Sequence, residues 1–262
     1  MPTVWSDLML MTMAAWTCVA EARPPAQQVY ERGLQGLSGG TSLSASEYEA
    51  LLGLLGGNDT TRLTSLYRTS VHGTTYDDLL DRVGDAKPLV FVIRKDKYVF
   101  GAFISDSLRL PDDPTAWHYY DCHKWYFSLS GHFDKPTKIV LPESTTVPPR
   151  MWVAGREEKT LGTNVLIGGQ LCLGWANSGG GPPAADIRSC LQVTYRSNVP
   201  EGYTGEWDEN GDAVLGGSTV FMADEIEVLS RVPPSSARQM GVWLSFCLWL
   251  SSFLFSMSYR MM

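Results

Sequence analysis

The sequence has few of the features that mark nucleic-acid-binding proteins. Its 21 Lys and Arg side chains are outnumbered by 28 Asp and Glu, for a formal net charge of −7, and the basic side chains are scattered along the chain. Nucleic-acid binding draws its free energy from clustered Lys and Arg that neutralise phosphates. A nucleic-acid partner is therefore not expected, whereas an acidic surface can meet a basic patch on another protein.

Paired cysteines are also missing. The five cysteines are odd in number and form no CxxC motif, which favours a reducing compartment. Cys172 and Cys190 lie in apolar, strand-like runs and are predicted to be buried and inert. A cysteine-dependent redox or stress enzyme is the alternative interpretation, and it needs Cys122, Cys172 or Cys190 to be accessible with a low pKa.

No metal, nucleotide or hydrolase motif is present. The spacing of His72, His118, Cys122, His123 and His132 matches no structural zinc pattern, and the histidines are predicted to lie on the surface or in loops. There is no GxSxG, and the SGGGPP segment lacks the Lys-Ser/Thr of a phosphate-binding loop. We therefore expect no catalytic residues, no metal and no cofactor.

The WDENGDA segment superficially resembles the start of a calcium-binding loop. Its glycine stands at the fourth position, whereas the calcium loop needs glycine at the sixth. Asn210-Gly211 is instead predicted to form a two-residue hairpin turn, in which both residues have positive φ.

Both ends of the chain carry apolar runs. Residues 8–20 outline a secretory signal without its positive charge, so a signal peptide, an apolar helix and a disordered leader all remain open. The Pro-, Gln-, Gly- and Ser-rich stretch 23–46 is predicted to be a linker.

Residues 240–259 are uncharged and, as a helix of about 30 Å, long enough to span a bilayer. A buried helix and a lipid-anchor signal are the alternatives. Asn58 is a glycosylation acceptor only in the secretory pathway.

The middle of the chain reads as many short strands with few helices. A Ser-x-x-Glu start and the pair Gly56-Gly57 bound a short helix, and a second helix is predicted after Thr74 or Thr75. Segment 88–105 is predicted to be a hairpin whose connection is RKDK. The expected fold is α+β, mainly β: a two-sheet antiparallel β-sandwich with a few short flanking helices over residues 44–231, between an N-terminal segment and linker (1–43) and a C-terminal linker with an apolar helix (232–262).

Two carboxylates alternate with aliphatic residues at the end of this region. Glu225 and Glu227 project to one face of a strand, and Ile226 and Val228 project to the other. Taken alone, the pattern predicts that the carboxylates form the solvated face of a half-buried strand. A glycosidase-like pair is disfavoured, because the two groups point side by side about 7 Å apart instead of flanking a substrate.

The order of the segments from Leu66 to Arg231 resembles the TLDc domain family. The chain has LYRTSVHG at the family's opening strand and turn, a Phe-Gly strand in YVFGAFIS, the aromatic strand WYFSLS, a Gly-Gly segment in LIGGQLCLG and the ending EIEVLSR. The residues that carry this resemblance are Tyr67, Arg68, Ser70, Gly73, Phe100, Gly101, Gly168, Gly169, Glu225 and Glu227. His72 stands where the family usually has Asp, and Ile167 and Gln170 also depart from its pattern.

The resemblance implies a two-sheet sandwich whose first and last strands meet. It also implies a role in oxidation resistance through a protein partner, the vacuolar proton-pumping ATPase, with no established catalytic mechanism. By this resemblance Glu225 and Glu227 are a handle of the fold or of its partner surface. Members are generally intracellular, which favours a cytosolic domain with residues 240–259 as a tail anchor over a secreted or membrane-displayed binding module.

Overall fold

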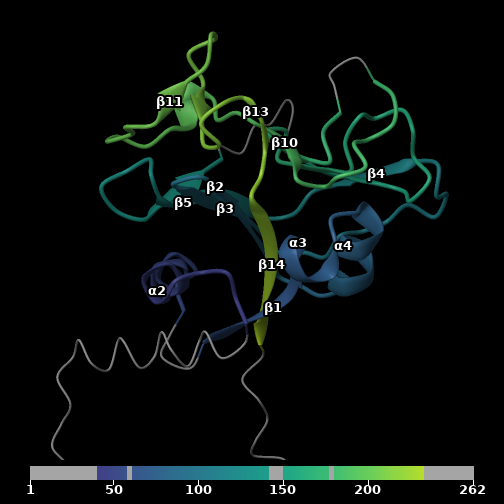
Figure 1. The fold of residues 1–262 in the computed structure, drawn as a ribbon, viewed down its shortest axis with the longest axis horizontal. Coiled ribbons are helices and arrows are strands. Elements are labelled where there is room, and N and C mark those ends of the chain that lie inside the picture. Colours follow the sequence, from purple (N-terminus) through teal and green to yellow (C-terminus); the bar gives the residue numbers. More distant parts are fainter. Residues whose placement is uncertain (1–39, 58–60, 142–149, 177–179, 233–262) are drawn as a thin grey trace, which may run out of the picture.

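The computed structural model describes residues 40–57, 61–141, 150–176 and 180–232, which build two facing antiparallel sheets with short helices around them (Figure 1). The first sheet has the strand order β1 (Arg62–Arg68), β14 (Glu225–Val232), β2 (Leu89–Lys95), β3 (Tyr98–Ile104), β5 (Lys124–Ser130) and β6 (Thr137–Val140). The second has the order β13 (Val220–Met222), β10 (Ser189–Gln192), β9 (Leu171–Leu173), β8 (Val165–Ile167), β7 (Met151–Ala154) and β4 (Trp117–Tyr120). The predicted mainly-β sandwich is confirmed.

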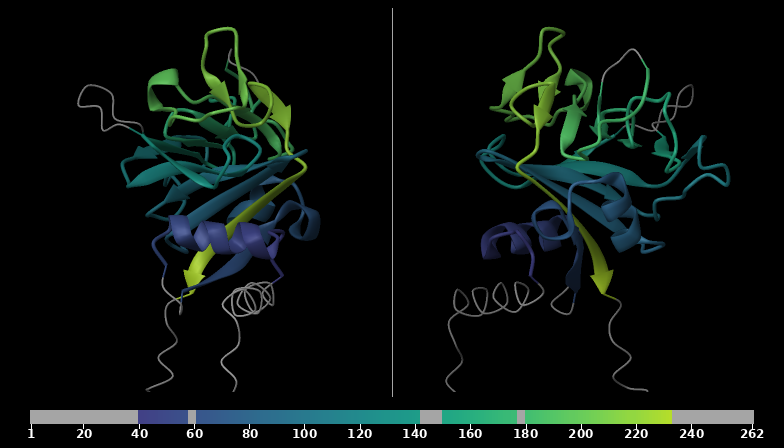
Figure 2. Two further views of the ribbon diagram at one scale, coloured as in Figure 1. Left: turned by 90° about the vertical axis from the view of Figure 1, so that its left-hand side faces the viewer. Right: turned by 45° about the vertical axis from the view of Figure 1, so that its right-hand side comes forward.

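The main core lies between the two sheets, and a second apolar layer lies outside the first sheet. Alternating residues of each strand face opposite ways, so a strand covered on both faces needs apolar residues throughout. β2 has this character: Phe91 and Ile93 join the core between the sheets, while Val90 and Val92 join the outer layer. Figure 2 shows α2 (Ala45–Leu54), drawn in purple, on the outer side of the first sheet.

Three α-helices of the described residues flank the first sheet. α2 (Ala45–Leu54) begins at Ser44 with a capping box and buries Tyr48, Leu51 and Leu52 in the outer layer. α3 (Thr69–His72) follows β1, and α4 (Tyr76–Val83) is capped by Thr75, one of the two predicted cap positions. The buried face of α4 joins the core between the sheets, so α2 and α4 cover opposite faces of the first sheet.

The first and last strands of the domain are neighbours. β1 pairs antiparallel with β14, with Arg68 opposite Glu227, and a bulge interrupts the pairing between Ser65 and Tyr67. β14 pairs on its other side with β2. β14 is thus an internal strand, and the predicted meeting of the two ends of the domain is confirmed.

The hairpin predictions have mixed outcomes. β2 and β3 form the predicted hairpin. β11 (Glu206–Trp207) and β12 (Ala213–Val214) also pair, but the prediction of a two-residue turn at Asn210-Gly211 is wrong. The connection runs from Asp208 to Asp212, and within it only Gly211 has a positive φ. The Gly211 N–H donates to the Asp208 carbonyl and closes a four-residue turn. Gly211 then forms a β-bulge, which needs the positive φ. A short 3-10 helix, η1 (Arg196–Asn198), precedes this hairpin.

The terminal predictions fall mostly outside the described residues. The apolar run 8–20, Asn58 and the C-terminal apolar helix 240–259 all lie there. Within the ranges that the structure describes, no helix is long and apolar enough to cross a membrane. Residues 40–43, which the sequence places in a linker, are instead packed on the domain, with Leu43 buried in the outer layer.

Candidate functional site at the junction of the first and last strands

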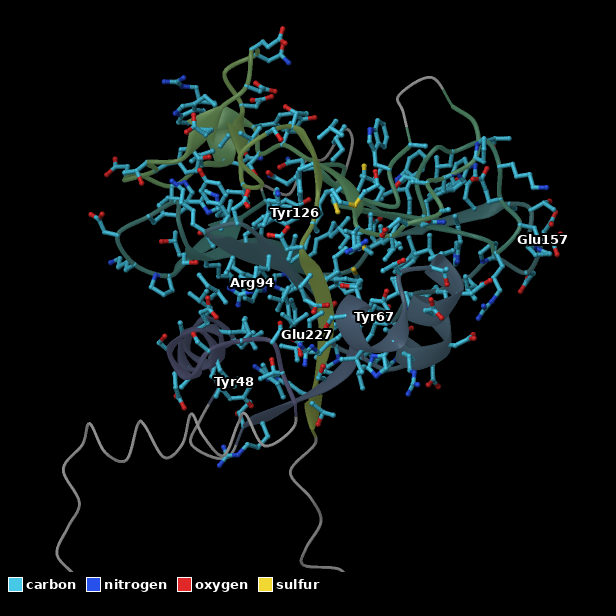
Figure 3. All side chains as sticks on the ribbon, in the orientation of Figure 1. Tyr48, Tyr67, Arg94, Tyr126, Glu157 and Glu227 are labelled. Atoms are coloured by element: carbon cyan, nitrogen blue, oxygen red, sulfur yellow. The ribbon has the colours of Figure 1, made fainter. Side chains whose placement is uncertain are left out.

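The pairing of β1 with β14 gathers most of the polar residues singled out in the sequence. Figure 3 shows Glu227 on β14 between Arg94 of β2 and Tyr67 of β1. Arg68 lies at the end of β1, and Ser70 lies in the helical turn that follows it. Gly73 closes that turn with a φ of 101°, where a side chain would be strained.

Glu225 fastens the start of α3 to β14. Its Oε1 accepts hydrogen bonds from Thr69 Oγ1 at 2.6 Å and from the Ser70 N–H at 3.0 Å, and Arg68 Nη2 lies 3.7 Å from its Oε2. Burial acts to raise the pKa of Glu225, but the hydrogen bonds from Ser70 and Thr69 outweigh it and lower that pKa. Glu225 is therefore an ionised anchor for the turn.

Glu227 fastens the chain that enters α2. It is fully buried, and its Oε2 accepts from Thr41 Oγ1 at 3.0 Å, the Ser42 N–H at 2.8 Å and Ser42 Oγ at 2.5 Å. Its Oε1 has no hydrogen-bond partner. The carboxylate thus joins two segments that lie 185 residues apart in the sequence.

The predicted solvated carboxylate face is therefore wrong. The alternation itself is correct, since Ile226 and Val228 enter the core between the sheets. The opposite face, however, is covered by α3 at Glu225 and by residues 41–42 at Glu227. A partner cannot contact Glu227 while these residues remain in place.

Tyr67 and Gly73 stabilise the turn after β1. Tyr67 is fully buried, and its hydroxyl donates to the Gly73 carbonyl at 2.8 Å. His72, which stands where the family usually has Asp, accepts the Arg68 N–H at its Nδ1 at 2.9 Å. A Cβ on Gly73 would lie 2.2 Å from Asp78 Oδ2. These residues have structural contacts and do not converge on an open site.

The remaining family positions are packing positions away from this junction. Phe100 is buried in the core between the sheets. A Cβ on Gly101 would lie 1.8 Å from the Phe91 carbonyl oxygen, so the neighbouring strand passes too close for any side chain. Gly168 and Gly169 both have positive φ, at 58° and 75°, and form the tight turn that joins β8 to β9.

The titratable groups of the core lack the properties of a reaction centre. Cys172 and Cys190 are buried as predicted, and burial raises both pKa values, to about 12 for Cys172. Burial likewise raises the pKa of the half-buried Cys122. His132, predicted to lie at the surface or in a loop, is fully buried between Tyr98 and Tyr203, and desolvation lowers its pKa to about 4. Among the described residues, no three His, Cys, Asp or Glu are placed to hold a metal ion.

An exposed aromatic cluster on the second sheet was missed by the sequence reasoning. Trp117 and Tyr119 of the end strand β4 are 37% and 50% exposed. Trp152 of β7 stacks on Trp117 with ring centroids 4.6 Å apart, and the Arg150 guanidinium lies 5.1 Å from the centroid of Tyr119. We call these four residues the aromatic platform. The alternation in AWHYYD was the available signal, but exposure could not be inferred without knowing that β4 is an end strand.

The comparisons with known proteins agree with the resemblance seen in the sequence. A search of curated proteins finds no match to the chain. The family model described as TLDc domain matches residues 38–134, which run from just before α2 through β5 and contain Tyr67, Arg68 and Phe100. The described β14 completes the sheet that this matched region begins. Over residues 38–134 the chain is therefore similar to the TLDc domain family.

Proposed function

We propose that the chain is a non-catalytic protein-interaction domain that supports oxidation resistance by binding the vacuolar proton-pumping ATPase. TLDc domains are commonly linked to oxidation resistance, and the matched region gives the family-level basis for that role. Experiment must test two parts of this proposal: that the pump is the partner, and that the domain acts by binding it.

The observation that carries the proposal is the aromatic platform. Trp, Tyr and Arg are the residues most enriched at the energetic centres of protein interfaces, and Trp and Tyr bury much area at low conformational cost. Trp117, Tyr119, Trp152 and Arg150 lie together at one end of the second sheet. Among the described strands, β4 has a sheet neighbour on one side only, so its other edge can meet a partner.

The chemistry of the buried groups favours binding over turnover. A nucleophilic or redox-active thiol needs a depressed pKa and access to its substrate, whereas burial raises the pKa of Cys122, Cys172 and Cys190. The carboxylates Glu225 and Glu227 are engaged by hydroxyl and amide donors of the domain itself. Both carboxylates hold segments of the fold together.

Affinity purification from detergent extracts followed by mass spectrometry tests the proposal. We expect the full chain to co-purify pump subunits and the Trp117→Ala/Tyr119→Ala variant to lose them. Trp207→Ala is the matched control, because Trp207 is 41% exposed but lies on the β11–β12 hairpin. Pump subunits absent from every sample would refute the partner, and equal recovery with all three chains would refute the platform as the contact.

The enzyme alternative has a separate test. If the chain were a cysteine-dependent enzyme, the purified protein would consume peroxide, and substituting Cys122, Cys172 and Cys190 would abolish that activity. We expect no peroxide consumption above a chain lacking the three thiols, because their pKa values are raised.

The proposed location is the cytosolic face of a membrane, with residues 240–259 as the anchor. Cell fractionation of the full chain and of a version ending at residue 236 tests this placement. The anchor predicts that only the full chain sediments with membranes and that its domain is digested by protease added to intact vesicles. Cleavage near residues 20–22, with glycan on Asn58, would instead support a secreted or membrane-displayed binding module.

A further inference from the structure

Residues 40–44, which we call the strap, are bound to the first sheet through polar contacts at residues 40–42 and through the buried side chain of Leu43. Glu227 accepts the Ser42 N–H and the hydroxyls of Thr41 and Ser42. Arg68 Nη1 donates to the Gly40 carbonyl at 2.7 Å, and Arg94 Nη2 donates to the Ser42 carbonyl at 3.2 Å. Charged side chains therefore hold residues 40–42 of the strap in place through hydrogen bonds to its backbone and hydroxyl groups.

The strap also determines where α2 lies. Ser44 ends the strap and caps the helix, and Arg94 Nη2 lies 2.9 Å from the carboxylate of Glu47 in its first turn. α2 covers an apolar face of the first sheet that includes Val92, Trp125 and Leu229. Release of the strap would loosen α2 and uncover that face.

The charged groups that hold the strap and its neighbours carry a net negative charge. The groups concerned are the guanidiniums of Arg68 and Arg94 and the carboxylates of Glu47, Glu225 and Glu227. Two cations against three carboxylates leave one net negative charge. A phosphoryl group adds about −1.5 to −2 at neutral pH. Placed on Ser42 Oγ, it would stand against Glu227, which is fully buried and poorly screened by salt.

We propose that Ser42 is a phosphorylation site whose modification detaches the strap from Glu227 and frees α2 from the first sheet. In the reaction, Ser42 Oγ attacks the γ-phosphorus of ATP in a protein kinase. The new O–P bond forms as the bond from that phosphorus to the ADP oxygen breaks, and the hydroxyl proton passes to a base of the kinase. The phosphorylated Oγ can no longer donate to Glu227, and the phosphoryl group is repelled by it.

Two features select Ser42 among the serines of this region. It gives Glu227 both its hydroxyl and its N–H, at 2.5 and 2.8 Å, so one modification disrupts the centre of the contact. Ser42 is also only partly covered, so a kinase can reach it when the strap opens. Ser46 is exposed in the first turn of α2, has no hydrogen bond to Glu227 among the described contacts, and provides a matched control position.

Hydrogen–deuterium exchange on the full chain tests the proposal. We compare Ser42→Glu with the uncharged Ser42→Ala and with Ser46→Glu, which adds the same charge nearby. Ser42→Glu should raise the exchange rate of the α2 amides about tenfold or more above both controls, because it places a second carboxylate against the buried Glu227, whereas Ser42→Ala only removes the hydroxyl. Amides of β3 should keep their protection and so report that the domain remains folded.

Two further arms make the outcome decisive. Adding Glu227→Gln to Ser42→Glu should slow α2 exchange again, because it removes the opposing charge. A full chain carrying phosphoserine at 42 should regain α2 protection on treatment with phosphatase, even if the Glu variant unfolds. Equal α2 exchange in Ser42→Glu and Ser42→Ala, no rescue by Glu227→Gln, or an unmodified Ser42 in phosphopeptide maps of the cellular protein would each overturn the proposal.

Discussion

Removing the Glu227 side chain should destabilise the domain far more than its place on a strand face suggests. Glu227→Ala leaves Thr41 Oγ1, Ser42 Oγ and the Ser42 N–H without their acceptor. Hydrogen bonds to charged groups contribute about 1.5–3 kcal/mol each, although such values do not add. The loss is partly offset, because a carboxyl group with an unpartnered oxygen is no longer buried. We expect the free energy of unfolding to fall by about 3 kcal/mol.

Urea unfolding of the full chain in mild detergent, followed by near-ultraviolet circular dichroism, measures this change. The midpoint should fall with the slope unchanged, which attributes the effect to stability. Glu227→Gln keeps an acceptor of the same shape and should cost about 1 kcal/mol. Glu206→Ala, at an exposed carboxylate of β11, should stay within about 0.5 kcal/mol of the parent. If Glu227→Ala matched Glu206→Ala, the anchoring role of Glu227 would be refuted.

Three other predictions concern the turn, the buried histidine and the thiols. Gly168→Ala should destabilise more than Gly169→Ala, because both have positive φ but only a Cβ at 168 would lie 2.9 Å from the Tyr126 hydroxyl; thermal unfolding of the pair checks this. The pKa of His132 is lowered from 6.5 to about 4 by desolvation, so the unfolded chain binds more protons between these values and stability should fall by about 2 kcal/mol from pH 7 to pH 5 in denaturant titrations. Because burial raises the pKa of Cys172 to about 12, iodoacetamide at pH 7.5 should leave it unmodified in the folded chain, as peptide mass spectrometry can verify.

Each of these outcomes has an internal comparison. His132→Gln should flatten the pH dependence, while His123→Asn, at an exposed position, should leave it unchanged; a dependence that survives His132→Gln would contradict the assignment. Rapid alkylation of Cys172 in the native chain, at the rate seen in urea, would show that the thiol is accessible. Equal melting temperatures for the two glycine variants would show that the contact at 168 relaxes without cost.

Local sequence signals placed most of the secondary structure. Ser44 and Thr75 cap the two predicted helices, because a short polar side chain followed by an acidic residue satisfies the free N–H groups of a helix start. The Gly168-Gly169 pair, noted in the sequence only as a break in an apolar run, occupies the β8–β9 turn, since two adjacent positive-φ residues favour glycine. The Asn210-Gly211 prediction failed because the same dipeptide also fits a longer turn that ends in a bulge.

The sequence by itself determined which side chains share a face of β14, because successive residues of a strand point to opposite sides. It could not determine whether that face meets water. Glu227 is buried only because residues 41 and 42, 185 or more positions away, are brought across it by the docking of α2. His132 and the aromatic platform follow the same rule: their exposure depends on which distant segment packs beside them, and only the tertiary structure decides that.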